Sequence, residues 1–160
     1  ILNSLKISTE NTIMDTNRIL FQVDSEGVNA LLNIAICDGM AALREILDAV
    51  INEYAAKNNM LCSIKQFESG EALVEEYKRC GGGFHLIFLD NKMKQLTGAE
   101  TALIIRKYDR QCGIVFVTSC DSRYEFTASA PLKILQKPIG KEEIFKVLDM
   151  FLAGSRQQCG

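Results

Sequence analysis

Four short segments of the chain are almost continuously apolar, which is the pattern of strands buried on both faces of a parallel sheet. They cover residues 33–37, 84–89, 113–117 and 132–136. A fifth segment, 61–67, is interrupted by Ser63, Lys65 and Gln66, and this pattern is typical of a strand at the edge of a sheet.

Between these segments, apolar residues recur with the i, i+3, i+4 spacing of amphipathic helices. The clearest series consists of Leu43, Ile46, Leu47, Val50, Ile51 and Tyr54. Ser69 is a good N-cap for a helix that runs to about Arg79, where three consecutive glycines end it. Two further helices are predicted, from Gly98 to about Tyr108 and around residues 144–151.

Residues 121–131 form the least regular part of the pattern. Residues 123–126 can form a short helix, with Tyr124 and Phe126 predicted to lie in the core, whereas residues 127–131 are poor helix material. We therefore predict a short or frayed helix at this point.

The alternation of strands and helices predicts an α/β fold with right-handed crossovers and helices on both faces of a parallel sheet. The specific prediction is a flavodoxin-like, doubly wound, five-stranded parallel sheet with strand order 2-1-3-4-5. Before it, residues 18–23 could form an extra strand or a helical turn, and residues 24–29 are predicted to be a linker. The predicted division is an N-terminal extension or linker over 1–30, one domain over 31–153 and a C-terminal tail over 154–160.

A different polar group follows each of the four buried strands. Asp38, Asp90, Thr118 (with Ser119) and Lys137 occupy these positions in chain order. In open parallel sheets, ligands bind just beyond the carboxyl ends of the strands. The four side chains are therefore predicted to gather at one edge, although Asp90 alone is also compatible with a simple turn cap.

In these four pieces the sequence resembles the receiver domain of bacterial two-component response regulators. The pieces are Leu32–Asp38, Leu86–Asp90, Ile114–Ser119 and Leu135–Pro138. The sequences of these pieces most resemble those of receivers that precede LytTR-type DNA-binding domains. The resemblance covers about residues 31–152.

The resemblance implies that Asp90 accepts a phosphoryl group from a partner sensor histidine kinase and then switches an output domain or regulatory partner. It implies that Mg²⁺ is held by Asp38, Asp90 and the backbone carbonyl of Lys92. It further implies that Thr118 is the switch hydroxyl, that Lys137 contacts the phosphoryl oxygens, and that the peptide bond before Pro138 is cis. A homodimer is also compatible with the family.

Three departures from the family pattern change what can be expected of the site. Gly39 stands where a second acidic residue normally binds the metal, so Mg²⁺ binding should be weakened. Lys94 replaces a common proline, and Ile134 replaces the aromatic residue that usually rotates on activation. The alternative is therefore a degenerate pseudo-receiver that acts as a phosphorylation-independent interaction module.

Two enzyme or carrier classes with a similar pattern are disfavoured. A haloacid-dehalogenase-like phosphatase needs a second Asp two residues after the nucleophile, where this chain has Lys92. A flavodoxin-like cofactor carrier needs a Ser/Thr/Gly-rich phosphate loop after the first strand, and residues 38–43 do not form one. We therefore do not expect an enzyme.

Composition limits the partners and the cellular location that can be expected for this chain. The 160 residues carry 18 basic and 20 acidic side chains, and the net charge of −2 is too small to argue for a polyanionic partner. Since the sequence has no basic stripe and no DNA-binding motif, we do not expect this chain itself to bind nucleic acid. No apolar run is long enough for a membrane span, and no secretory signal is apparent. Six cysteines without metal-binding spacing suit a reducing cytoplasm, and Cys120, two residues after Thr118, is expected to lie near the predicted site. His85, the single histidine, is predicted to be a packed strand residue.

Overall fold

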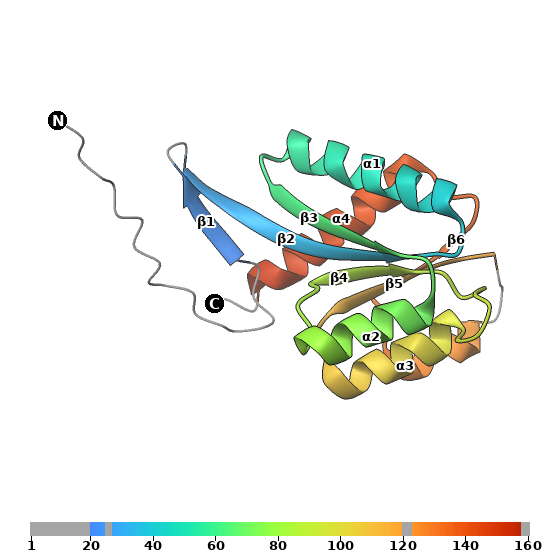
Figure 1. The fold of residues 1–160 in the computed structure, drawn as a ribbon. Coiled ribbons are helices and arrows are strands. Elements are labelled where there is room, and N and C mark those ends of the chain that lie inside the picture. The colour runs from blue at the N-terminus through green and yellow to red at the C-terminus, as the bar shows by residue number, and fades with distance from the viewer. Residues whose placement is uncertain (1–19, 25–26, 120–122, 158–160) are drawn as a thin grey trace.

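A six-stranded β-sheet forms the centre of the molecule and carries helices on both faces (Figure 1). The structure, a computed structural model, describes residues 20–24, 27–119 and 123–157. In chain order its elements are β1 (Leu20–Asp24), β2 (Gly27–Cys37), α1 (Ala41–Lys57), β3 (Leu61–Phe67), α2 (Gly70–Cys80), β4 (Leu86–Leu89), α3 (Gly98–Tyr108), β5 (Gly113–Thr118), the 3₁₀ helix η1 (Arg123–Ser129), β6 (Lys133–Gln136) and α4 (Lys141–Gln157).

Five of the strands are parallel and confirm the predicted topology. They lie in the order β3-β2-β4-β5-β6, which is 2-1-3-4-5 when they are numbered from β2. The register aligns Ile34 with Leu86, and Leu86 with Gly113. The carboxyl ends of the four strands predicted to carry polar groups therefore lie next to one another.

The sixth strand, β1, forms an antiparallel hairpin with the first half of β2. Leu31 is paired on both sides, with Leu20 of β1 and with Leu61 of β3. The predicted linker was wrong for Asp24, which ends β1, and for residues 27–29, which belong to β2. A short polar stretch between two apolar runs is typical both of a linker and of a hairpin turn. Here the stretch forms a hairpin because β1 pairs with β2. Residues 1–19 and 25–26 lie outside the described part of the chain.

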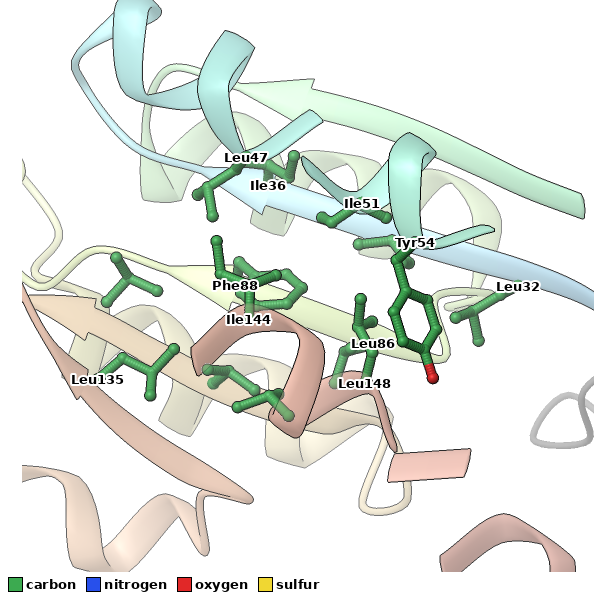
Figure 2. Close-up of a cluster of buried hydrophobic side chains, with 14 residues drawn as sticks. Leu32, Ile36, Leu47, Ile51, Tyr54, Leu86, Phe88, Leu135, Ile144 and Leu148 are labelled. Carbon is green, nitrogen blue, oxygen red and sulfur yellow. The ribbon is translucent and has the colours of Figure 1, made fainter. Parts of the chain in front are cut away.

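Side chains alternate along β2 between two separate apolar layers, as the two-residue period of a strand requires. Leu32, Ile34 and Ile36 face α1 and α4, in the layer shown in Figure 2. The layer is completed by Leu47, Ile51, Tyr54, Leu86, Phe88, Val115, Val117, Leu135, Ile144, Val147 and Leu148.

The opposite layer, towards α2, α3 and η1, combines small and large side chains. Ala35 and Cys37 of β2 are fully buried there together with Ala102 of α3. The larger members are Phe67, Leu73, Tyr77, Ile87, Leu89, Ile105, Ile114, Phe116 and Phe126.

Capping fixes where α2 and α3 begin. The Ser69 side chain accepts a hydrogen bond from the backbone of Ala72, as predicted, and α2 ends at Gly81 in a left-handed conformation with φ of 73°. Thr97 and Glu100 form a reciprocal capping box at the start of α3. No helix in the described ranges is both long enough and apolar enough to cross a membrane.

The irregular segment after β5 is the 3₁₀ helix η1. Phe126 is fully buried, as predicted, but Tyr124 is 94% exposed, so its prediction as a core residue was wrong. Residues two positions apart in a 3₁₀ turn point in different directions, so only one of the two aromatic rings can face the sheet. Arg106 of α3 holds the end of η1, because its Nε donates to the carbonyl of Ser129 at 2.7 Å.

Candidate functional site

The four predicted strand-end residues come together at one edge of the sheet. Lys137 joins the two acids, since its Nζ lies 2.8 Å from Oδ2 of Asp38 and 3.3 Å from Oδ1 of Asp90. Asp38, Asp90 and Thr118 are all buried. The backbone N–H of Lys137 donates to the carbonyl of Thr118 at 2.9 Å, which places β6 beside β5 at this point.

Asp38 is held in place by its surroundings on three sides. Its Oδ1 accepts a hydrogen bond of 2.8 Å from the backbone N–H of Met40, and its own N–H donates to the carbonyl of Phe67. Arg44 of α1 reaches back and donates from Nη1 to the Asp38 carbonyl at 2.6 Å. The carboxylate is therefore preorganised with its second oxygen on Lys137.

Asp90 is buried like Asp38, but its carboxylate is held less firmly by its neighbours. Burial raises the pKa of this carboxyl above its ordinary value, Lys137 opposes that rise, and the negative charge of Asp38 adds to it. Its Oδ1 accepts no well-formed hydrogen bond among the described residues and has the Lys137 ammonium as its neighbour. A buried carboxylate oxygen with one loosely held cation is available to a further positive or electrophilic group.

The loop after Asp90 is fixed tightly to the start of α3. A Cβ atom on Gly98 would lie 2.2 Å from the carbonyl oxygen of Asp90, so only glycine fits there. Asn91 accepts hydrogen bonds from the backbone N–H of Gly98 and, through Oδ1, from that of Ala99 at 2.9 Å. This packing holds the Asp90 backbone against α3.

The departures seen in the sequence lie on the outside of the site. Gly39 is exposed, and a Cβ atom there would meet only the Glu68 carbonyl oxygen, at 3.9 Å. Lys92 and Lys94 are exposed in the loop. Ile134 is half-buried and packs against the layer that contains η1.

The peptide bond between Lys137 and Pro138 is cis, as predicted. Since Lys137 also lies beside Asp38 and Asp90, both parts of that prediction hold.

The remaining chemically active residues take no part in the cluster. His85 lies at the amino end of β4, is buried, and accepts a hydrogen bond on Nδ1 from the Asn33 backbone at 2.9 Å, as expected of a packed residue. Burial raises the pKa of Cys37 to about 12, which makes this thiol unreactive. Cys120 and Cys159 lie outside the described residues.

Two residues of the site were missed by sequence reasoning. Arg44 sits one helical turn into α1, and Asn91 directly follows Asp90. An Asn after a strand reads as an ordinary turn residue. An Arg on a helix reads as a solvated side chain, and only the position of α1 brings it to Asp38.

As a metal site, this edge of the sheet offers few ligands. The described residues contain no group of three or more His, Cys, Asp or Glu side chains placed to hold a metal ion. Asp38 and Asp90 remain as two hard oxygen donors. Mg²⁺ keeps several waters and commonly uses one or two carboxylates, so the donor set is compatible with it but sparse.

Comparison with known proteins agrees with this geometry. Residues 34–149 match the family described as the response regulator receiver domain. The osmolarity two-component system protein SSK1 of Saccharomyces cerevisiae is 33% identical over 95 residues, which are 59% of this chain. The chain spans only 12% of the length of that yeast protein.

Solved receiver structures share the fold. The response regulatory domain of mrkE from Klebsiella pneumoniae superposes with a TM-score of 0.69 at 20% identity, over 79% of this chain and 99% of that one. The response regulator TrrA of Thermotoga maritima, solved in complex with Mg²⁺-BeF, gives 0.64 at 22% identity, over 75% of this chain and 98% of that one. With the family match covering most of its length, the chain belongs to the response regulator receiver domain family of two-component signalling.

Proposed function

We propose that this receiver domain accepts a phosphoryl group on Asp90 from a phosphohistidine of a partner histidine kinase. The observation that carries the proposal is the buried Asp90 carboxylate, whose Oδ1 lies 3.3 Å from the Lys137 ammonium and accepts no well-formed hydrogen bond among the described residues. In this role the domain is a phosphoacceptor and not an enzyme acting on a separate substrate.

In the transfer, an Asp90 oxygen forms a bond to phosphorus while the bond from phosphorus to the donor imidazole nitrogen breaks. The electron pair of that bond leaves with the imidazole, and the product is an aspartyl phosphate. Such transfers depend mainly on positioning and on neutralising the phosphoryl oxygens. Lys137 supplies a compact positive charge for those oxygens, and Thr118 supplies a hydroxyl donor.

A divalent metal belongs to the proposal in a weakened form. Asp38, Asp90 and the backbone carbonyl of Lys92 would hold Mg²⁺, with water in the place left by Gly39. When bound, the ion supplies positive charge that offsets repulsion between the carboxylates and the incoming phosphoryl group. Until then, the ammonium of Lys137 fills that electrostatic role for both acids.

The readout of phosphorylation is also part of the proposal. Thr118 is buried at the end of β5, and a phosphoryl group on Asp90 would offer it new acceptor oxygens. An output domain or regulatory partner would respond to the resulting shift. Two further points stay predictions. The full-length protein would check whether this receiver precedes a LytTR-type domain, and sedimentation would check whether it forms a homodimer.

One observation favours the alternative, a pseudo-receiver that binds partners without phosphorylation. Gly39 removes a carboxylate, and the Lys137 ammonium already lies beside the two that remain. In that case the contacts of Lys137 with Asp38 and Asp90 would persist throughout the protein's function.

Intact-mass measurement after incubation with a small acyl phosphate donor and Mg²⁺ separates the two functions. The phosphoacceptor proposal expects the mass increase of one phosphoryl group, lost in Asp90→Asn and kept in Asp48→Asn, which changes a half-buried acid on α1 that pairs with Gln66. A wild type that stays unmodified at saturating Mg²⁺, while Gly39→Asp becomes phosphorylated, would favour the pseudo-receiver.

A further inference from the structure

Asn91 connects the loop after Asp90 to η1, and the phosphoryl transfer itself makes no use of it. Its side chain is buried, with 8% of its surface exposed. Oδ1 accepts a hydrogen bond from the Ala99 backbone of α3 at 2.9 Å, while Nδ2 donates to Oε2 of Glu125 at 3.4 Å. Because the oxygen end is held by α3, the amide plane is fixed and its nitrogen is directed at η1.

Glu125 lies directly before the residue that anchors η1 in the core. Phe126 is fully buried, and its ring centroid lies 4.1 Å from that of Phe116. Phe116 is on β5, two residues before Thr118. A displacement of Glu125 therefore reaches a buried ring that packs on the strand carrying the proposed switch hydroxyl.

The far end of η1 is held independently. Arg106 donates from Nε to the Ser129 carbonyl at 2.7 Å and from Nη1 to the Cys112 carbonyl at 2.8 Å. The Ser129 hydroxyl donates to the carbonyl of Phe126 at 2.7 Å. With this end fixed to α3, the contact between Asn91 and Glu125 is the more easily released of the two attachments, because 3.4 Å is near the upper limit for a hydrogen bond.

We propose that Asn91 is a positioning residue that passes the chemical state of Asp90 to η1 through Glu125. The inference rests on the proposed function, since it needs a phosphoryl group on Asp90. It gives this chain a connection between site and surface that does not require an aromatic side chain at residue 134, where Ile134 stands.

The physical basis is charge. An aspartyl phosphate carries about −1.5 to −2 charges at neutral pH where the free carboxylate carries −1, so phosphorylation adds negative charge one residue away from Asn91. The Glu125 carboxylate is then repelled from the loop, and its hydrogen bond with the Asn91 amide is lost. Freed at this end, η1 changes its position or its opening rate, together with the exposed Tyr124 beside Glu125.

Hydrogen exchange of the η1 amides, measured by mass spectrometry with and without the acyl phosphate donor and Mg²⁺, tests this link. In the wild type, phosphorylation should speed exchange over residues 123–130 by about fivefold, the equivalent of about 1 kcal/mol for one hydrogen bond. Glu125→Gln keeps an acceptor for the amide but removes the charge, so the effect of phosphorylation should shrink. Glu45→Gln, on α1 at the opposite face of the sheet, is the matched control and should behave as the wild type does.

Asn91→Asp gives the converse test. It keeps an acceptor for Ala99 but places a carboxylate opposite Glu125, so η1 should exchange rapidly before any phosphorylation, with little further change after it. A wild-type response in both Glu125→Gln and Asn91→Asp overturns the link. Intact mass on the same samples separates the two failures: a phosphorylated protein with unchanged η1 exchange refutes only the link, whereas an unmodified protein refutes the proposed function and the link with it.

Discussion

Restoring an acid at residue 39 is the most direct test of how metal and phosphorylation are connected in this receiver. Gly39 is exposed, its backbone conformation is not one that requires glycine, and an added Cβ atom would meet only the Glu68 carbonyl at 3.9 Å. Gly39→Asp should therefore fold normally while placing a third carboxylate next to Asp38 and Asp90.

The expected magnitude follows from the exposure of the position. Two unit charges about 4 Å apart in water attract by about 1 kcal/mol, so a divalent ion gains about 2 kcal/mol, or about thirtyfold in dissociation constant. A more buried geometry would increase this value because the effective dielectric constant is lower there.

The assay is the Mg²⁺ concentration that gives half-maximal phosphorylation by the acyl phosphate donor, read by intact mass. Gly39→Asn is the control, because it adds the same bulk without the charge and should leave the Mg²⁺ requirement near that of the wild type. An equal improvement in Gly39→Asn, or none in Gly39→Asp, would show that the missing carboxylate does not limit the site. If neither the wild type nor Gly39→Asp is modified, the loop that carries Lys92 and Lys94 blocks the site and the proposed mechanism fails.

Three further predictions concern stability, each measured by urea unfolding. Since burial raises the pKa of Asp90 above its unfolded value, its ionised form destabilises the fold. This destabilisation is absent below the pKa that Asp90 has in the unfolded chain and is complete above its pKa in the folded protein. Asp90→Asn should therefore be more stable than the wild type at neutral pH but not in acid; an equal difference in unfolding free energy at both pH values would contradict this. Phe126→Ala should cost about 3–5 kcal/mol, against about 0.5 kcal/mol or less for the exposed Tyr124→Ala; similar losses in both would refute the assigned burial. Lys137→Met leaves two buried carboxylates without their cation and should cost about 3 kcal/mol, whereas Lys92→Met should be nearly neutral; a neutral Lys137→Met would mean that the acids have other partners.

The regular parts of this fold could be predicted because each has its own local cause. The bounds of β3 were predicted correctly at both ends, those of α3 approximately, and Ser69 caps α2 as expected. The cluster of Asp38, Asp90 and Lys137 was also predictable, since parallel strands bring their carboxyl ends to one edge regardless of side-chain detail.

The features that were missed depend on contacts between distant residues. Tyr124 and Phe126 are both aromatic, and only the direction of the 3₁₀ turn decides that one is exposed and the other buried. The strand character of residues 27–29 depends on pairing with β1. Nothing in the local sequence distinguishes Asn91 from a solvated turn residue, because its burial results from the approach of α3 and η1.

The small side chains on one face of β2 have a consequence for how this domain can evolve. Ala35 and Cys37 are fully buried in the layer beneath α2 and α3, and α3 begins at Gly98, whose backbone lies against the Asp90 carbonyl. A larger residue at position 35 would push that layer outwards and displace the reactive carboxylate without touching it. A larger side chain at position 35 should therefore be tolerated best together with a smaller one at a position that packs against it.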